Sequence, residues 1–161
     1  MPIGTRFTPR SRHEYLVRDY LFSKSWRVFL PERTVWSRRR DRRKQIQVPL
    51  FPGYLFVSSS GGAKRLRDVS IIRGVVRLLG AGGSPLPVSR REVASLRLLV
   101  ASGELLRQTA YLVPGSRVRV VEGPLAGAEG TVARFGRKRH LIVSVELMQR
   151  SVAVELAEWQ L

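Results

Sequence analysis

Residues Gly115–Val132, which read GSRVRVVEGPLAGAEGTV, carry the clearest structural pattern in the C-terminal part of this 161-residue chain. Its first half alternates arginine with Val118 and Val120, which predicts a strand with one buried face and one exposed face. Three glycines then mark positions where the backbone turns tightly or approaches a neighbouring strand. The alternation resumes from Thr131 to Phe135, so the stretch predicts two strands of a small barrel.

This spacing resembles the KOW motif, which occurs in SH3-like barrels of transcription and ribosomal proteins. The positions that carry the resemblance are Gly115, Val118, Val120, Gly123, Gly127, Gly130 and Val132. The resemblance implies an SH3-like β-barrel over residues 113–161. The alternating valine, leucine and isoleucine residues favour the barrel over a helical alternative as the resting form.

A second module is expected to precede the barrel. Because such a barrel needs about 50–60 residues, residues 1–107 are expected to form a separate N-terminal domain, with a linker at residues 108–112. Capping-box patterns at Ser11–Glu14 and Ser89–Glu92 predict helix starts. Strands Thr34–Trp36 and Gln45–Val48 are expected to form a hairpin around a basic tip. The mixture predicts an α+β fold with an antiparallel sheet.

The positive charge is concentrated in the N-terminal module. Residues 1–107 contain 22 Lys/Arg and 7 Asp/Glu, a net charge of +15, whereas residues 108–161 contain 7 and 5, a net charge of +2. The densest segment, Arg38–Lys44, has six basic residues and one acidic residue, a net charge of +5. Such a field attracts polyanions, and nucleic acid is the favoured partner over an anionic membrane.

Several protein classes do not fit the sequence. No apolar run approaches the ~18–20 residues of a membrane span, and the first residues lack the apolar core of a secretory signal, which together predict a cytoplasmic protein. With no cysteine and two histidines, His13 and His140, in different modules, no disulfide, metal site or cofactor is expected. The chain has no phosphate-binding loop or nucleophile motif, so an enzyme is not expected.

The N-terminal module contains Val48–Val57 (VPLFPGYLFV), followed by Ile72–Val76, and Thr8–Glu14 precedes its first expected helix. The first two segments resemble the signature of the NusG family of transcription factors, and Thr8–Glu14 resembles the loop that opens the first helix of that family. Leu141–Leu147 and Arg150–Leu156 resemble the closing strands of specialised paralogues of the UpxY and RfaH type. The resemblance implies a transcription elongation or antitermination factor.

One segment departs from the family pattern. The family opens its first strand with a Trp-Tyr pair, whereas this chain has Met1–Phe7, which contains a proline and has little strand character. Either the chain starts downstream of the natural beginning or its first strand is degenerate. A missing central strand would expose sheet edges.

The resemblance implies that the N-terminal module binds the clamp helices of the largest RNA polymerase subunit through an exposed apolar patch, with Phe51, Tyr54 and Phe56 as its residues. Tyr54 and Phe56 share one face of their strand, opposite Leu55 and Val57. Alternation leaves two interpretations open. Either the aromatic residues face outward, or they are core residues and the aliphatic pair faces a helix.

Nucleic-acid contact is expected at two groups of basic residues. The hairpin tip supplies Arg38, Arg39, Arg40, Arg42, Arg43 and Lys44, although a solvated tip that protects a sheet edge is the alternative. Arg10, Arg12 and Arg73 match positions where related specialised factors touch the non-template DNA strand, and arginine suits phosphate pairing and base stacking. Nascent RNA is the other candidate polyanion, and surface ion pairs are the alternative role for these three arginines.

The partner of the barrel is also suggested by the resemblance. In relatives this domain binds a small-subunit ribosomal protein or the termination factor Rho, and the modest charge of residues 108–161 fits a protein partner. A monomer is expected. The competing hypothesis is a structural RNA-binding protein of the ribosomal KOW type, which would carry its basic excess on the barrel rather than upstream of it.

Overall fold

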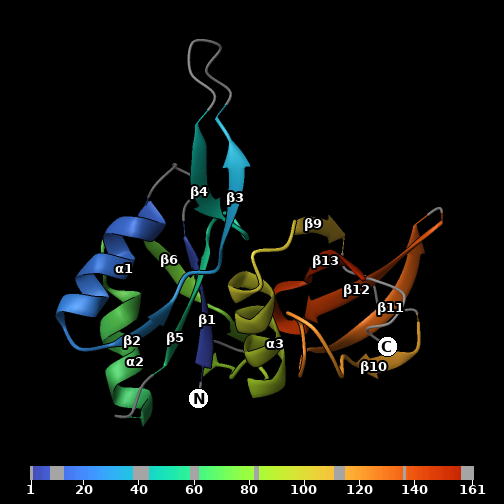
Figure 1. Ribbon diagram of the computed structural model, residues 1–161. Helices are drawn as coiled ribbons and strands as arrows, with labels where there is room; N and C mark the ends of the chain where they lie inside the picture. Colours follow the sequence, from blue (N-terminus) through green and yellow to red (C-terminus); the bar gives the residue numbers. More distant parts are fainter. Residues whose placement is uncertain are drawn as a thin grey trace.

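The computed structural model describes residues 2–7, 13–37, 44–58, 62–81, 84–110, 115–135 and 137–156, and side chains are described outside residues 2–7, 62–65, 110 and 135. Strands and helices alternate along the N-terminal two thirds, and strands dominate the remainder (Figure 1). In chain order the elements are β1 (Pro2–Phe7), α1 (His13–Ser23), β2 (Arg27–Phe29), β3 (Glu32–Trp36), β4 (Gln45–Pro49), β5 (Tyr54–Ser58), α2 (Gly62–Ser70), β6 (Val75–Leu78), β7 (Gly80–Ala81), β8 (Ser84–Pro85), α3 (Arg90–Ala101), β9 (Arg107–Ala110), β10 (Arg117–Arg119), β11 (Glu129–Phe135), β12 (Lys138–Val145), the 3-10 helix η1 (Glu146–Met148) and β13 (Arg150–Leu156).

The N-terminal module is built on a four-stranded antiparallel sheet with the order β2-β5-β1-β6. The segment Met1–Phe7 was expected to have little strand character, and this expectation is wrong for Pro2–Phe7. These residues form a central strand, with Ile3 opposite Val57 and Arg6 opposite Arg77. Pairing on both sides outweighs weak local propensity, and the proline is tolerated because it is the first residue of the strand.

One face of this sheet is covered by α1 and α2 (Figure 1). The apolar cluster between them is fully or almost fully buried and contains Val17, Leu21, Trp26, Leu30, Leu55, Val57, Leu66 and Val69. Burial of such residues at about 25 cal/mol per Å² of apolar surface is the main stabilisation of this layer. The module therefore has its own hydrophobic core on the helical side.

The C-terminal module is a five-stranded antiparallel sheet with the order β10-β11-β12-β13-β9. Its arrangement is consistent with the predicted KOW-type, SH3-like barrel, and the predicted α+β class is confirmed. Gly130 shows why glycine is needed here, because a Cβ atom at this position would lie 2.4 Å from the carbonyl oxygen of Ile142. Residues 107–110 pair with β13, so this sheet begins earlier than the expected boundary at residue 113, and Gln108 and Thr109 lie in a strand.

Helix α3 lies between the two sheets and contacts β11 and β12 (Figure 1). The predicted helix start is confirmed, since Ser89 is the N-cap of α3, although its side chain makes no capping hydrogen bond. The helix turns Val93, Leu96 and Leu99 into one apolar cluster that also includes residues of both sheets. The two modules consequently share a core.

A hairpin of β3 and β4 extends away from both sheets (Figure 1). The predicted hairpin is confirmed, with Thr34 opposite Gln47 and Trp36 opposite Gln45. Its tip, residues 38–43, lies outside the described residues. Among the helices that the structure describes, none has both the length and the apolar character needed to span a membrane.

Candidate functional site

The second face of the N-terminal sheet carries the aromatic residues singled out by the sequence. Leu55 and Val57 point to the layer of α1 and α2, whereas Phe56 belongs to the cluster on the opposite side. Of the two interpretations of this strand, the structure therefore shows the one in which the aliphatic pair faces helices. We call the opposite side, made of Phe29, Leu50, Phe51, Tyr54 and Phe56, the aromatic face.

Stacked rings organise the aromatic face. The rings of Phe29 and Phe56 are stacked with centroids 5.9 Å apart, and the guanidinium of Arg97 lies 4.2 Å from the centroid of the Phe29 ring. A cation over a ring face adds an electrostatic attraction to the packing. Sequence reasoning missed Phe29 and Arg97, because β2 is only three residues long and its ring pairs with residues far along the chain.

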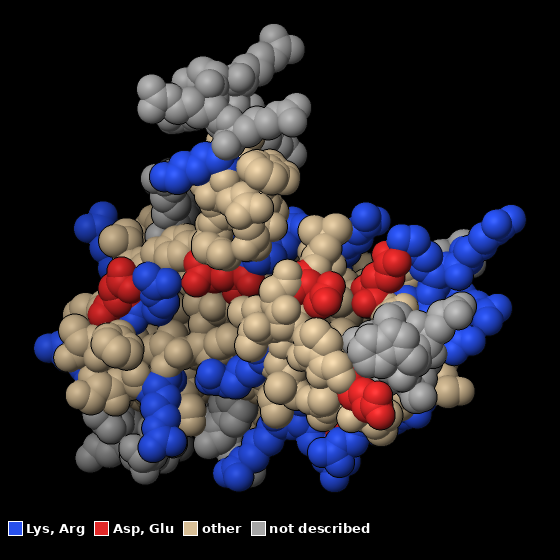
Figure 2. All heavy atoms as spheres, viewed as in Figure 1, with Lys and Arg blue, Asp and Glu red and all other residues tan. Residues whose placement is uncertain are grey.

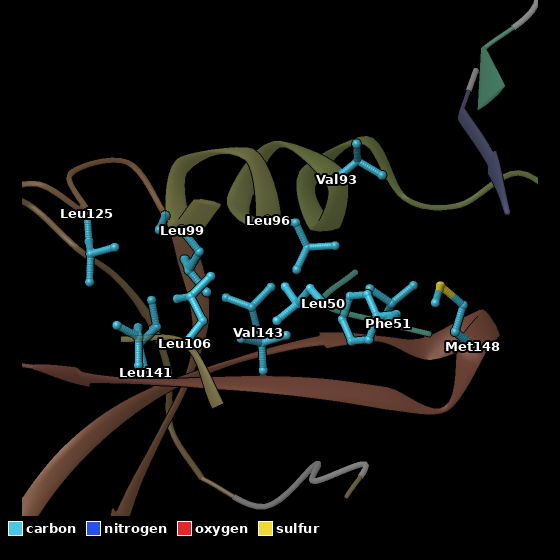
Figure 3. Close-up of a cluster of buried hydrophobic side chains, with 14 of the residues drawn as sticks. Leu50, Phe51, Val93, Leu96, Leu99, Leu106, Leu125, Leu141, Val143 and Met148 are labelled. Atoms are coloured by element: carbon cyan, nitrogen blue, oxygen red, sulfur yellow. The ribbon is translucent and has the colours of Figure 1, made fainter. Parts of the chain in front are cut away.

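The aromatic face is covered in this structure. Figure 3 shows Leu96 extending from α3 toward Leu50, and Met148 of η1 beside the Phe51 ring; Val93 belongs to the same apolar cluster. Phe51 and Phe56 are each only 1% exposed. The expectation that they form an exposed patch is therefore wrong for this arrangement, because α3 and the barrel occupy the space in front of them. Tyr54 remains half-buried.

Polar contacts connect α3 to the barrel at the edge of the shared core. The backbone N–H of Glu129 donates to the hydroxyl of Ser95 over 2.9 Å, and Ser95 is 2% exposed. The backbone N–H of Glu146 approaches Oε1 of Glu92 at 3.4 Å. Burial raises the pKa of the Glu92 carboxyl above its usual value, and this outweighs the hydrogen bond from Glu146. These two contacts therefore position α3 against the barrel.

A cavity of about 680 Å³ opens beside this junction. Its lining combines the start of α3 with strands β10, β11 and β12, and it contains both cationic and anionic side chains, among them Arg91, Arg117, Arg119, Glu92, Glu129 and Glu146. Because the charges of both signs are interspersed, the cavity does not select a ligand of one charge.

The start of α1 packs closely against two glycine loops. Oε1 of Glu14 accepts a hydrogen bond from the backbone N–H of Gly53 at 2.8 Å, while Ser11, the other half of the predicted capping box, lies outside the described residues. Gly74 has φ +100°, and a Cβ atom there would lie 2.7 Å from Nδ1 of His13. The neighbouring Arg73 is exposed. Arg10 and Arg12 lie outside the described residues, and the contact of these three arginines with nucleic acid stays a prediction.

The basic hairpin is described up to its tip. Lys44 is exposed, and its carbonyl accepts a hydrogen bond from the backbone N–H of Ser37 at 2.7 Å, which continues the ladder beyond Trp36. The other basic residues predicted for nucleic-acid contact, Arg38, Arg39, Arg40, Arg42 and Arg43, lie outside the described residues. The described part of the hairpin projects beyond the two sheets (Figure 1 and Figure 2).

The residues of the predicted KOW motif gather around β10 and β11. Val118 lies on β10 and Val132 on β11, and Val120 is almost fully buried. The connection between these strands contains Gly123 and Gly127. Within the described residues, no group of three or more His, Asp and Glu side chains is arranged to hold a metal ion.

Comparison with known proteins identifies the family to which the chain belongs. The family described as "Transcription termination factor nusG" matches residues 8–97. The chain is 32% identical over 149 residues to "Transcription termination/antitermination protein NusG" of Pasteurella multocida, covering 89% of this chain and 80% of that protein. The protein of the same name from Thermus thermophilus is 32% identical over 148 residues, covering 84% and 79%, and that of Escherichia coli K12 is 34% identical over 137 residues, covering 80% and 73%.

A solved structure titled "Domain interaction in Thermotoga maritima NusG" has the same fold, with a TM-score of 0.53 and 18% identity, and the match covers 96% of this chain and 93% of that one. Fold and sites together define a two-module protein in which an α+β sheet domain precedes a KOW-type barrel. The chain belongs to the NusG family.

Proposed function

We propose that this protein is a transcription termination or antitermination factor that binds the clamp helices of RNA polymerase through its aromatic face. The observation that carries the proposal is the position of Phe51, Tyr54 and Phe56 on one side of a sheet whose other side is already filled by α1 and α2. In this structure α3 and the barrel cover this apolar side, and a pair of polymerase helices would take the place of the barrel.

Access to that surface requires a rearrangement. Phe51 and Phe56 are almost fully buried by α3 and the barrel, so a polymerase helix can reach them only after the barrel moves away. Such a movement separates the apolar residues of the barrel from those of the N-terminal module, and it breaks the hydrogen bond between Glu129 and Ser95. The form that binds polymerase is therefore a minor one in the free protein, and its population sets the apparent affinity.

Basic residues supply the second contact. Arg10, Arg12, Arg73 and the hairpin segment Arg38–Lys44 would hold the non-template DNA strand or nascent RNA beside the polymerase. Arg73 and Lys44 are exposed, which such a role requires. Phosphate contacts of this kind position a protein without reading sequence.

The barrel would recruit a further factor once it is separated from the aromatic face. Its apolar residues at the junction, Met148 among them, are then exposed and can pack on a protein partner, either a small-subunit ribosomal protein or Rho. A role specialised for a few operons, as in the UpxY and RfaH type, stays a prediction.

Binding of the full chain to an isolated clamp-helix fragment of RNA polymerase tests this proposal. Tyr54→Ala removes the half-buried ring of the aromatic face and should weaken binding at least tenfold, whereas Phe22→Ala removes a ring that is 75% exposed on α1 and should have no effect. Equal affinities of the two variants, with both folded by circular dichroism, would contradict the proposal.

A further inference from the structure

The hairpin arms carry an exposed aromatic side chain that the proposed polymerase and phosphate contacts do not use. Trp36 is 62% exposed at the last described pair of β3, directly before the basic segment Arg38–Lys44. It takes part in no ring stacking or cation–π contact within the described part of the chain. Its exposed ring offers a flat apolar face on which a base can stack.

The residues around Trp36 define one side of the hairpin. Residues opposite each other in an antiparallel pair share a face, as do residues two apart in a strand, so Thr34, Trp36, Gln45 and Gln47 lie together. All four side chains are exposed. Nε2 of Gln47 donates to the hydroxyl of Thr34 at 2.9 Å, while the amide of Gln45 makes no hydrogen bond within the described residues. This side therefore combines the aromatic plane of Trp36 with the unoccupied amide of Gln45.

The root of the hairpin is fixed. The hydroxyl of Tyr15 on α1 donates to Oε1 of Glu32 at 2.8 Å, and a guanidinium nitrogen of Arg18 lies 3.7 Å from Oε2 of the same carboxylate. Burial, together with this hydrogen bond, raises the pKa of Tyr15 to about 12, so the hydroxyl keeps its proton. Glu32 is the only acidic residue in the two arms, and its charge is partly compensated at the far end from the tip. Among the described arm residues, the acidic side chain on this side is that of Glu32, four positions from Trp36 at the far end of the strand.

We infer that this side of the hairpin is a binding site for an unpaired nucleic-acid strand, with a base stacked on Trp36. The exposed Lys44, next to Gln45 in the chain, would attract a phosphate, and the Gln45 amide, which both donates and accepts, would contact a base edge. A duplex hides its base faces and cannot use the ring. The inference rests on the proposed function only in assigning nucleic acid as the partner of the hairpin.

The contributions of base stacking and of charge to the binding affinity can be measured separately. Truncation of one stacking ring weakens binding of a single strand by about 5- to 150-fold, whereas removal of a phosphate contact also changes the dependence of affinity on salt. Trp36→Ala should therefore lower affinity and leave the salt slope unchanged. Trp36→Phe retains a ring and should restore most of the affinity.

The test is fluorescence anisotropy with the full chain, no polymerase, and a labelled ten-nucleotide oligodeoxyuridine, an oligouridine of equal length and a mixed-sequence duplex. Phe22→Ala, which removes an exposed ring from α1, is the matched control and should bind as the unaltered protein does. A selective loss for single strands in Trp36→Ala supports the site, and the more strongly affected strand identifies the sugar.

Three results would overturn the site. These are unaltered single-strand binding by Trp36→Ala, an equal loss for the duplex, or Trp36→Phe as weak as Trp36→Ala. Because polymerase is absent, a failure here leaves the clamp-helix proposal intact. Failure of the clamp-helix experiment likewise leaves this site intact.

Discussion

The hydroxyl of Ser95, in the middle of α3, accepts a hydrogen bond of 2.9 Å from the backbone N–H of Glu129 at the start of β11. This bond joins residues of two modules that are separated by 34 positions in the chain. Since Ser95 is 2% exposed, water cannot readily replace it. The bond marks the place where the barrel is held against the N-terminal module and over the aromatic face.

Ser95→Ala should therefore destabilise the closed arrangement. The substitution leaves the Glu129 N–H without its partner, which costs about 1–3 kcal/mol. We expect a lower free energy of unfolding in urea. Ser23→Ala is the control, because the Ser23 hydroxyl donates to the carbonyl of Tyr20 at an exposed helix end and its removal should cost less than about 0.5 kcal/mol. Equal effects of the two changes would show that the Ser95 bond does not hold the junction.

Met148→Lys should favour the open arrangement. Met148 is 5% exposed and packs in the shared core, where a lysine ammonium cannot be accommodated without solvent. Affinity for RNA polymerase should rise, because a larger fraction of the protein then exposes its aromatic face. Met148→Leu, which nearly conserves volume, should leave the affinity unchanged. An unchanged or lower affinity of a folded Met148→Lys variant would show that the barrel does not block the polymerase surface.

The raised pKa of Glu92 predicts how the stability of the folded protein depends on pH. Its pKa is raised in the folded state, chiefly by burial, so the protonated form is favoured there. The resulting contribution to stability is present in full below the carboxyl pKa of the unfolded chain, near about 4.3, and is lost as pH rises through the folded-state pKa. Glu92→Gln should thus stabilise the protein more at pH 7 than at pH 4, measured by urea unfolding. A gain that is equal at both pH values would contradict this assignment.

Charge at the hairpin tip should appear in salt titrations. Changing Arg38, Arg39 and Arg40 to glutamine should lower nucleic-acid affinity and reduce the slope of log K against log salt by about 0.7–0.9 for each phosphate contact removed. The matched control removes the same charge from the barrel, at the exposed Arg134, Arg137 and Arg150, and should change the slope little. Identical slopes for the two triple variants would indicate that the hairpin makes no phosphate contacts.

The sequence predicted those parts of the fold that are encoded locally. The β3–β4 hairpin follows from two alternating segments around a charged tip, and the barrel follows from glycines and valines at fixed spacing. The strand Pro2–Phe7 could not be predicted in this way, because its pairing on both sides, rather than its own residues, makes it a strand.

The environment of the aromatic residues also could not be derived from the sequence. Both faces of Tyr54–Ser58 are hydrophobic, so alternation identifies two faces without saying what covers each. The cover of Phe51 comes from α3 and from Met148, almost a hundred positions along the chain, and no local pattern indicates such a contact. Burial of Glu92 and Ser95 depends on the same junction.

The central claim is that the aromatic face binds transcribing RNA polymerase after the barrel has moved. The most direct measurement is the affinity of the full chain, Tyr54→Ala and Met148→Lys for a reconstituted elongation complex at low ionic strength. The account predicts measurable binding by the unaltered chain, weaker binding by Tyr54→Ala and tighter binding by Met148→Lys. No affinity in any of the three, with both modules folded, would contradict it.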